Sequence, residues 1–332
     1  MKIKHFEVDS QEDQTKLSAL PADFSRENLT SANAGQSTDV EIATVFVNSV
    51  VDTQTIDAMP NLKLLITRST GFDHIDVPYA HSKEITVCNI PGYGSRTVAE
   101  FTFALILGLS RKIFGAVEQI KHNNWETSHF EGFNLQGKTI GIVGTGRIGL
   151  NVAQIARGFD MKIIAHDAFP NEQKAESYGF KYASSLEELL GLSDVVTLHV
   201  PATKDTKHLI NLENISKFKK GALLINTARG DVIDPQAILL GLQENILSGV
   251  GLDVIDGEHE LKEEAELMRE GHISQEKLKT LLSDHALMNH PKVLITPHIA
   301  FNTQEARLEI ITATLNNIRG FLEDEPQNIV TS

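Results

Sequence analysis

The stretch KTIGIVGTGRIG, from Lys138 to Gly149, decides the predicted fold. Its β-branched, apolar first half is typical of a buried strand, and the segment after it has the composition of a helix. The pattern G-x-G-x-x-G between them lets a strand turn tightly into a helix and lets a pyrophosphate approach the helix N-terminus. The predicted cofactor contacts in this loop are Gly144, Gly146, Arg147, Ile148 and Gly149. The stretch therefore predicts a dinucleotide-binding unit.

An acidic residue follows the next predicted strand. Asp167 stands 18 positions after Gly149, where a carboxylate would hydrogen-bond the ribose hydroxyls of adenosine. The five positions after Asp167 hold no Arg or Lys to bind a 2′-phosphate, so the sequence favours NAD over NADP. Two structural alternatives remain open at this point: a glycine-rich turn without a ligand, and Asp167 as a helix cap.

Short apolar runs of the same kind recur along the whole chain. They lack polar alternation, so they suit strands buried on both faces, and helical stretches separate them. This pattern predicts an α/β protein with two doubly wound parallel sheets. The predicted strands are Lys2–Val8, Ala43–Val47, Lys63–Arg68, Ile85–Ile90, Thr139–Val143, Lys162–His166, Asp194–Val200, Ala222–Asn226, Gly249–Val254 and Val293–Thr296.

Three other segments bear on the organisation of the chain. The polar stretch Asn123–Gly137 is where the pattern alone places the domain boundary. The apolar run Phe101–Leu109 predicts a helix with a packing role, most naturally at a contact between domains or subunits. The acid-rich stretch from Glu258 to Asp284 has no strand pattern, and it predicts a solvated helical insertion.

Composition excludes several classes of protein. The 332 residues are 41% hydrophobic, which is enough for substantial cores in two domains. Acidic residues outnumber basic ones, 44 to 30, and the formal charge of −14 argues against nucleic-acid binding. The single cysteine, Cys88, allows no internal disulfide or thiolate metal cage and favours a reducing compartment. With no recognisable signal peptide and no apolar run long enough to span a bilayer, we expect a cytoplasmic protein without a membrane partner.

Two motif matches are not expected to carry function. Gly132–Thr139 fits the phosphate-binding pattern GxxxxGK[ST], but that pattern requires a strand before it and a helix after it. Here a polar loop precedes the match and a predicted strand follows, so nucleotide hydrolysis is not expected. His259-Glu260 does not continue into HExxH, and no two histidines stand in ligand spacing with a cysteine or an acid, so no metal site is predicted.

Three charged residues, Arg229, Glu258 and His298, follow the carboxyl ends of predicted strands. Ligands of open α/β sheets bind beyond these ends, so the three side chains can converge beside the dinucleotide. An arginine fork holds a carboxylate, a histidine exchanges protons near neutral pH, and a carboxylate beside the imidazole keeps it protonated. Each residue taken singly is also compatible with a structural role. Together, beside a nicotinamide fingerprint, they predict a catalytic site.

These motifs identify a family resemblance. GTGRIG, HVPAT at 199–203, INTARG at 225–230, GLDV with Glu258 five positions after Asp253, and TPHIAF at 296–301 resemble the D-isomer-specific 2-hydroxyacid dehydrogenases. The resemblance covers nearly the whole chain. RSTGFDHID at 68–76 and IPGYGSRTVAE at 90–100 are similar to the D-lactate dehydrogenase branch of that family, as is the long acidic stretch before His298.

The resemblance implies roles for individual residues. Arg229, Glu258 and His298 would be the catalytic residues, and the backbone around Thr70 and Gly71 would help to hold a substrate carboxylate. Tyr93 and Phe301 would wall a small side-chain pocket, with a further wall residue somewhere in Phe46–Asn48. Asp253 would contact the nicotinamide carboxamide and Pro201 would lie against adenine. The remaining implied cofactor contacts are His199, Val200, Thr227 and Ala228.

The resemblance also implies an organisation and a reaction. It replaces the boundary at Asn123–Gly137 with a flavodoxin-like substrate domain of residues 1–96 and 301–332 and a Rossmann NAD domain of residues 97–300. A homodimer is expected. The expected reaction is the reversible reduction of pyruvate to D-lactate by NADH. The alternatives are a reductase of a bulkier 2-keto acid or of hydroxypyruvate or glyoxylate, and, from another class, an NAD-sensing corepressor-like binding protein.

Overall fold

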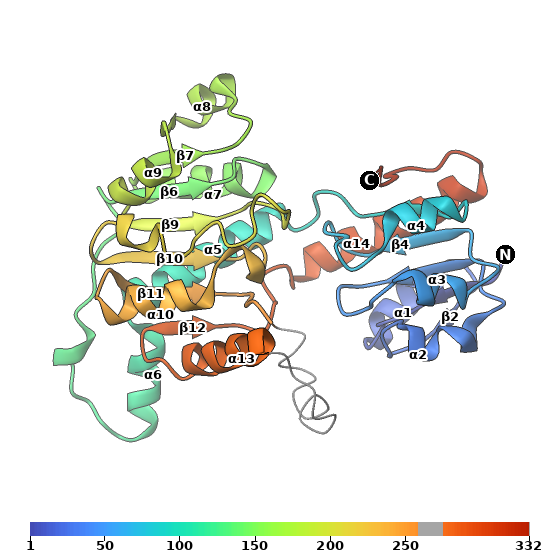
Figure 1. The fold of residues 1–332 in the computed structure, drawn as a ribbon, viewed down its shortest axis with the longest axis horizontal. Helices are drawn as coiled ribbons and strands as arrows, with labels where there is room; N and C mark the ends of the chain where they lie inside the picture. Colours follow the sequence, from blue (N-terminus) through green and yellow to red (C-terminus); the bar gives the residue numbers. More distant parts are fainter. Residues whose placement is uncertain (258–274, 332) are drawn as a thin grey trace. The chain divides into compact units, whose positions relative to one another are not determined.

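The computed structural model describes residues 1–257 and 275–331, and the chain divides into two units (Figure 1). Unit 1 comprises Met1–Gly94 and Asn302–Ser332, and unit 2 comprises Ser95–Phe301. These limits lie within two residues of the domain limits that the resemblance implies. In the part of the chain that the structure describes, no helix has both the length and the apolar character to cross a membrane.

Unit 1 is built on a parallel sheet in the order β2-β1-β3-β4-β5. Its strands are β1 (Ile3–His5), β2 (Asp23–Phe24), β3 (Ile42–Val45), β4 (Leu64–Thr67) and β5 (Thr86–Cys88). Every residue of β3 and β4 is buried, which explains why these segments show no polar alternation. This is the flavodoxin-like strand order, whose switch point lies between β1 and β3.

The helices of unit 1 include a long one from the C-terminal end of the chain. The helices are α1 (Gln11–Leu17), α2 (Ser31–Ala34), α3 (Thr53–Asp57), α4 (Val77–Ser82) and α14 (Gln304–Leu322), with a 3₁₀ turn η1 (Gly35–Ser37). The apolar face of α14 buries Ile310, Ile311 and Ile318. Its Asn317 side chain donates to the Asn89 carbonyl at 3.0 Å, so this helix is bonded to the segment that directly follows β5.

Unit 2 is built on a second parallel sheet, in the order β12-β11-β10-β9-β6-β7-β8. Its strands are β6 (Thr139–Val143), β7 (Lys162–His166), β8 (Lys181–Tyr182), β9 (Val195–Leu198), β10 (Ala222–Asn226), β11 (Leu247–Leu252) and β12 (Val293–Ile295). Its α-helices are α5 (Ser95–Ser110), α6 (Ile113–Lys121), α7 (Arg147–Gly158), α8 (Glu172–Tyr178), α9 (Leu186–Leu192), α10 (Pro235–Gln243) and α13 (Gln275–Met288). Its 3₁₀ turns are η2 (Ser128–Phe130), η3 (Ile215–Lys217) and η4 (Gly230–Val232). The order reverses between β6 and β9, as in Rossmann folds.

The predicted fold class is confirmed: the protein is α/β, with two parallel sheets and flanking helices. The predicted strands Thr139–Val143, Lys162–His166 and Ala222–Asn226 match β6, β7 and β10 residue for residue. The edge strands β2 and β8 were not predicted, because two residues are too few to show a periodicity.

Two sequence-based predictions concern helices of unit 2, and one of them needs correction. The run Phe101–Leu109 lies in α5 and packs within unit 2, where Gly249 and Gly251 of β11 leave room for Leu109 and Leu105. Leu105 and Leu109 therefore pack on the sheet of unit 2, and a contact of this helix with another domain or subunit stays a prediction. The described part of the acidic insertion is helical, in α13, but it is not fully solvated: Leu281 is buried and α13 packs on α10.

Candidate active site

The glycine loop after β6 lies at the switch point of the unit 2 sheet. Gly144 has a φ of +94°, and a Cβ there would meet the carbonyl oxygen of His199 at 2.6 Å. A Cβ on Gly149 would meet the carbonyl oxygen of Gly144 at 2.0 Å, so the start of α7 packs directly on the loop. A Cβ on Gly146, the N-cap of α7, would meet nothing within 4 Å. The loop therefore leaves open space at a helix N-terminus, which suits an anion.

Asp167 follows β7 and is bonded to the same loop. Its Oδ2 accepts hydrogen bonds from the N–H and the hydroxyl of Thr145 at 2.6 and 2.7 Å, and its Oδ1 accepts from the Phe169 N–H at 2.9 Å. Burial raises the pKa of this carboxyl, but the hydrogen bonds outweigh it and hold the pKa below its ordinary value. Asn171 caps α8, so the interpretation of Asp167 as a helix cap is wrong. Asp167 is a fixed negative charge beside the loop.

His199 follows β9, across the switch point from the glycine loop. Its Nε2 lies 2.9 Å from the Thr197 hydroxyl, and burial lowers the pKa of the ring to about 3, so the imidazole is neutral at neutral pH. Among the described residues its buried Nδ1 has no hydrogen-bond partner. Val200 packs against Gly144, and Pro201 after it is exposed.

The Arg229 loop follows β10 and is organised by Asn226, whose side chain is wholly buried. The Asn226 amide donates to the Arg229 carbonyl at 2.7 Å and accepts from the Ala228 N–H at 3.0 Å. The hydroxyls of Thr227 and Thr102 lie 3.1 Å apart, which bonds the loop to α5. These contacts fix the backbone from which the Arg229 guanidinium extends.

The His298 loop follows β12 and is held by Asp253. The Asp253 carboxylate accepts from the Thr296 hydroxyl at 2.5 Å, from the Ile299 N–H at 3.0 Å and from the Ala300 N–H at 2.7 Å. The Asp253 carbonyl accepts from the His298 N–H at 2.9 Å. Burial raises the pKa of Asp253, and these hydrogen bonds oppose the shift. One side chain thus organises the whole turn around the histidine.

His298 itself has a φ of 56°, the left-handed region that few residues with a Cβ adopt. Its half-buried ring meets the Phe301 ring edge to face, with centroids 6.5 Å apart. The left-handed backbone conformation costs free energy, and a residue keeps it only where surrounding contacts stabilise it, often at functional sites. At His298 these contacts are the hydrogen bonds of Asp253.

The strand register aligns these loops at one edge of the sheet. Asn226 pairs with Leu252, and Leu252 pairs with Ile295, so β10, β11 and β12 end side by side. Arg229 and His298 each lie three positions past these ends, on strands whose backbones are about 10 Å apart at the usual spacing. Both side chains are long enough to reach a small molecule between them.

Glu258 lies outside the described residues, but the segment leading to it is described. A Cβ on Gly230, next to Arg229, would meet the carbonyl oxygen of Ile255 at 2.0 Å and the Asp256 nitrogen at 2.5 Å. The Arg229 loop and the segment before Glu258 are therefore in direct backbone contact, which a side chain at position 230 would prevent.

The predicted substrate-binding residues of unit 1 follow β4 and β5. The exposed Thr70 donates its hydroxyl to the Ile90 carbonyl at 2.9 Å, and the Asn89 amide donates to the Thr70 carbonyl at 2.8 Å. The Ser69 hydroxyl donates to the Gly71 carbonyl at 2.6 Å. Tyr93 is half-buried and packs against the apolar cluster around β3 and β4. The loop after β4 is thus bonded to the end of β5.

Comparison with known proteins decides the family. Residues 103–300 match the profile of the NAD-binding domain of D-isomer-specific 2-hydroxyacid dehydrogenases. This chain belongs to that family. The match covers the glycine loop, Asp167 and the three strand ends that carry Arg229, Asp253 and His298.

Similar dehydrogenases of the family differ in what their names say they act on. The chain is 37% identical to 2-hydroxyacid dehydrogenase A of Aspergillus oryzae, over 89% of this chain and 82% of that protein. It is 38% identical to a glyoxylate reductase of Thermofilum pendens, over 83% and 76%. The structure of D-lactate dehydrogenase from Aquifex aeolicus complexed with NAD and lactic acid superposes with a TM-score of 0.87 at 36% identity, covering 99% of each chain.

The cofactor of this dehydrogenase is NAD, and the residues at the switch point of unit 2 fit it. The glycine loop is open at Gly146, where a Cβ would have no neighbour, and the α7 N-terminus points there without a side-chain cap. The backbone of His199, whose buried Nδ1 has no hydrogen-bond partner among the described residues, lies beside the same loop. Asp167 keeps its negative charge. When bound, the cofactor supplies or accepts a hydride.

Two residues that organise the site were not predicted from the sequence. Asn226 shapes the Arg229 loop, and Thr296 donates to Asp253 in the His298 loop. Both lie inside the motifs INTARG and TPHIAF, but an amide and a hydroxyl at a strand end look like ordinary turn residues. Within residues 1–257 and 275–331, no cluster of three or more His, Cys, Asp or Glu is arranged to hold a metal ion.

Proposed function

We propose that this dehydrogenase reduces a short 2-keto acid with NADH, most favourably pyruvate to D-lactate, and that the reaction is reversible. One observation carries the proposal: Asp253 holds His298 in a left-handed turn at the same sheet edge as Arg229. An acid–base group and a carboxylate-binding group on one edge suit a substrate with a carboxylate next to a carbonyl. The name and lactic acid ligand of the similar Aquifex aeolicus structure support pyruvate and lactate as the pair.

The proposed mechanism assigns one task to each side chain. The Arg229 guanidinium pairs with the substrate carboxylate and stabilises the charge that grows on the keto oxygen. His298 donates a proton to that oxygen, and Glu258 is proposed to orient the ring. The backbone at Thr70 and Gly71 is proposed to bind the carboxylate as well. In the reverse direction His298 takes the proton from the hydroxyl group.

The remaining residues are proposed to bind the cofactor and to limit substrate size. Asp167 binds the ribose hydroxyls, Asp253 contacts the carboxamide and Pro201 lies against adenine. The other proposed contacts are His199, Val200, Thr227, Ala228 and the glycine loop. We propose that Tyr93 and Phe301 limit the size of the substrate side chain, so that a methyl group is favoured over a larger group.

A substrate panel tests the proposal. NADH oxidation is measured with pyruvate, glyoxylate, hydroxypyruvate, 2-ketoisocaproate and phenylpyruvate, and the enantiomer of each product is determined by chiral chromatography. We expect the highest kcat/KM with pyruvate and D-lactate as the product. A higher kcat/KM with glyoxylate or phenylpyruvate would reassign the substrate. NADH binding without turnover of any of these acids would favour a cofactor-sensing protein.

Substitution of the two proposed catalytic side chains tests their roles. His298→Gln should lower kcat by a factor on the order of 10²–10⁴, because the proton donor is lost. Arg229→Gln should lower kcat and also raise the KM for pyruvate, because the carboxylate loses its charged partner. The control is His122→Gln, on a highly exposed histidine of unit 2. A His298→Gln enzyme with normal kcat, or an unchanged KM for pyruvate in Arg229→Gln, would contradict the respective role.

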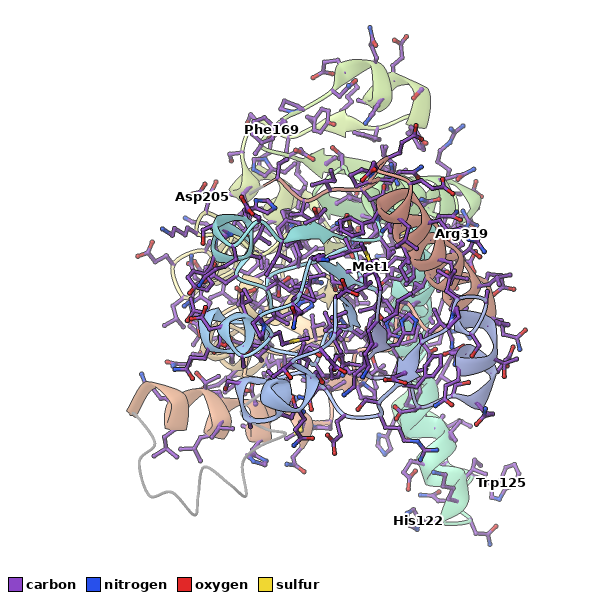
Figure 2. The ribbon with its side chains drawn as sticks, turned by 90° about the vertical axis from the view of Figure 1, so that its right-hand side faces the viewer. Met1, His122, Trp125, Phe169, Asp205 and Arg319 are labelled. Atoms are coloured by element: carbon purple, nitrogen blue, oxygen red, sulfur yellow. The ribbon has the colours of Figure 1, made fainter. Side chains whose placement is uncertain are left out.

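We propose further that the enzyme is a homodimer and works in the cytoplasm. The helix α6 has no buried residue, and its apolar side chains Ile113, Phe114, Val117 and Ile120 are each between 44% and 55% exposed. Figure 2 shows Trp125 beyond the end of this helix, pointing away from the rest of unit 2. Exposed apolar side chains gathered on one helix face are typical of a surface that another protein chain covers, and we propose a second copy of this chain. The sequence has one cysteine, Cys88, and a chain that can form no internal disulfide suits a reducing compartment.

A further inference from the structure

Three strand ends meet around one loop in unit 1. The strand β3 lies between β1 and β4, and all three are parallel, so their carboxyl ends share an edge. Glu7 follows β1, the loop Phe46–Ser49 follows β3, and Arg68 follows β4. The gap between β1 and β3 is the switch point of this sheet, where ligands of open α/β sheets bind.

The Glu7 carboxylate holds this loop through four hydrogen bonds. Its Oε1 accepts from the Phe46 N–H at 2.9 Å and from the Ser49 hydroxyl. Its Oε2 accepts from the N–H and the side-chain amide of Asn48 at 3.1 and 3.2 Å. A single carboxylate thus accepts hydrogen bonds from both ends of the loop, which lies 39 to 42 positions further along the chain.

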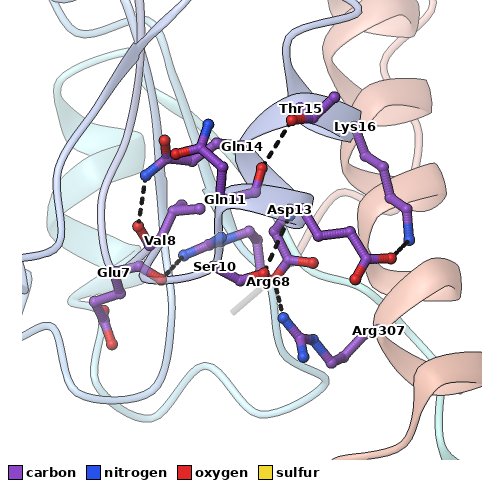
Figure 3. A network of polar contacts seen from close by, with 11 residues as sticks. Glu7, Val8, Ser10, Gln11, Asp13, Gln14, Thr15, Lys16, Arg68 and Arg307 are labelled. Atoms are coloured by element: carbon purple, nitrogen blue, oxygen red, sulfur yellow. Dashed lines mark hydrogen bonds and ion pairs between the residues drawn. The ribbon is translucent and has the colours of Figure 1, made fainter.

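The Glu7 backbone is itself held in an uncommon conformation. Its φ is 55°, in the left-handed region, and its N–H donates to the Glu27 carbonyl at 3.1 Å. Its carbonyl accepts from the Arg68 guanidinium at 2.9 Å, as Figure 3 shows. Residues with a Cβ keep such a conformation only when the surroundings require it, and this occurs most often at functional sites.

Arg68 joins Glu7 to the side chain of Phe46. The arginine is buried, and its guanidinium donates to the carbonyls of Phe6 and Glu7 and lies 5.9 Å from the centre of the Phe46 ring. Burial lowers its pKa to about 10, against the opposite effect of nearby carboxylates, so it stays charged at neutral pH. The half-buried Phe46 is therefore held at its backbone by Glu7 and at its ring by Arg68.

The same contacts distinguish Phe46 from Asn48 and Ser49. The Asn48 side chain is engaged with Glu7, and Ser49 is buried against it. Phe46 has a large side chain, its backbone is bonded to Glu7 and its ring lies near Arg68, at the sheet edge that also carries Thr70 and Gly71. An aromatic ring whose backbone is held at a switch point is suited to exclude large substrate side chains.

We propose that Glu7 is a positioning residue, which sets the loop Phe46–Ser49 and through Phe46 decides which 2-keto acid side chains the enzyme accepts. The proposal rests on the function proposed above. Glu7 touches neither the substrate nor the cofactor in this scheme, and its effect is transmitted entirely by the loop.

Hydrogen exchange tests the positioning without any need for activity. An amide can accept hydrogen bonds through only one of its two ends, so Glu7→Gln loses the bonds to Phe46 and Ser49 or those to Asn48. Exchange of the Phe46 and Asn48 N–H groups, followed by NMR or mass spectrometry, should accelerate at least about tenfold. The matched control is Glu41→Gln. Glu41 stands at the other end of β3, where it accepts from the Lys2 N–H at 3.0 Å and pairs with Lys63, and its substitution should leave exchange at 46–49 unchanged.

Substrate selectivity tests whether the position of the loop decides which 2-keto acid side chains the enzyme accepts. In Glu7→Gln the ratio of kcat/KM for pyruvate to that for phenylpyruvate should fall about tenfold, through the KM of the keto acids, with the KM for NADH unchanged. In a Phe46→Ala background, Glu7→Gln should have little further effect on this ratio, because the residue through which it acts is gone. Glu41→Gln should keep the wild-type ratio. A purely structural role would lower activity with all acids equally.

A second variant tests the proposal even if Glu7→Gln does not fold. Asn48→Asp is a substitution at an exposed position that sets a carboxylate against Oε2 of Glu7, so it should displace the same loop and shift the same ratio. Unchanged exchange and an unchanged ratio in both variants would overturn the proposal. A wild-type enzyme that reduces no 2-keto acid would instead overturn the proposed function and the selectivity role, while the exchange measurement would still decide the positioning.

Discussion

At the scale of single residues, burial changes the chemistry of His5 more than its neighbours in sequence do. His5 lies in β1 with no exposed surface, stacked on Phe24 and 2.8 Å from the Thr44 hydroxyl through Nδ1. Its buried Nε2 has no partner among the described residues. Burial, reinforced by the positive charge of Arg68, lowers its pKa to about 3. The sequence HFEV shows none of this, because the cause is the sheet that surrounds the ring.

This shift predicts a pH dependence of the free energy of unfolding. Between about pH 6.5 and 3 the unfolded chain binds a proton on His5 that the folded protein does not, so stability falls as the pH falls. The contribution approaches about 1.4 kcal/mol per pH unit in the middle of that window. Urea unfolding of His5→Gln, followed by circular dichroism between about pH 4.5 and 6, should show a slope smaller by about one proton. His122→Gln, on an exposed ring, should keep the wild-type slope, and an equal slope in both variants would show that His5 ionises in the folded state.

At the scale of one element, the packing of α7 on the glycine loop depends on the absence of a side chain. A Cβ on Gly149 would lie 2.0 Å from the Gly144 carbonyl oxygen, which is backbone and cannot move aside cheaply. Gly158, at the other end of α7, would gain a Cβ in open space. Position 149 therefore requires a glycine, whereas position 158 has room for a side chain.

Alanine at these two positions should have opposite effects. Gly149→Ala should lower the free energy of unfolding by about 1–3 kcal/mol, through overpacking, and weaken NADH binding at least about tenfold, because the loop that faces the pyrophosphate must shift. Gly158→Ala should leave NADH binding unchanged and stabilise the protein by up to about 1 kcal/mol. Thermal unfolding and NADH fluorescence titration measure both quantities. Equal NADH affinities in the two variants would show that the contact between α7 and the loop is not required for binding.

At the scale of the whole molecule, the exposed apolar face of α6 predicts self-association. Light scattering after size-exclusion chromatography should give twice the 36.6 kDa of one chain. Val117→Glu, which places a charge in the middle of the apolar face, should shift the protein toward the monomer, since an unpaired charge is costly to bury. His122→Glu, at the end of the same helix, adds the same charge outside that face and should stay dimeric. A wild-type monomer would refute the dimer, and a dimer in both variants would place the interface elsewhere.

Local patterns in the sequence were sufficient to predict much of the fold and to propose part of the site. The β-branched runs predicted β6, β7 and β10 to the residue, because strands buried on both faces leave a short-range signature. The glycine spacing and Asp167 predicted the dinucleotide loop, because the whole motif is contained in one stretch of the chain, residues 138–167. Arg229 and His298 could be chosen because they stand just past strand ends, and chain order alone shows that.

The tertiary structure decided how these pieces are held. Asp253 accepts hydrogen bonds from the turn that carries His298, 45 positions further along the chain. Glu7 accepts a hydrogen bond from the Phe46 N–H, 39 positions further along. Each pair exists because two strands that are distant along the chain are neighbours in a sheet: β11 beside β12, and β1 beside β3. Strand order follows from how the apolar faces of all the elements pack together, and a local pattern does not encode it. The residue types therefore came from the sequence, and their partners from the order of the strands.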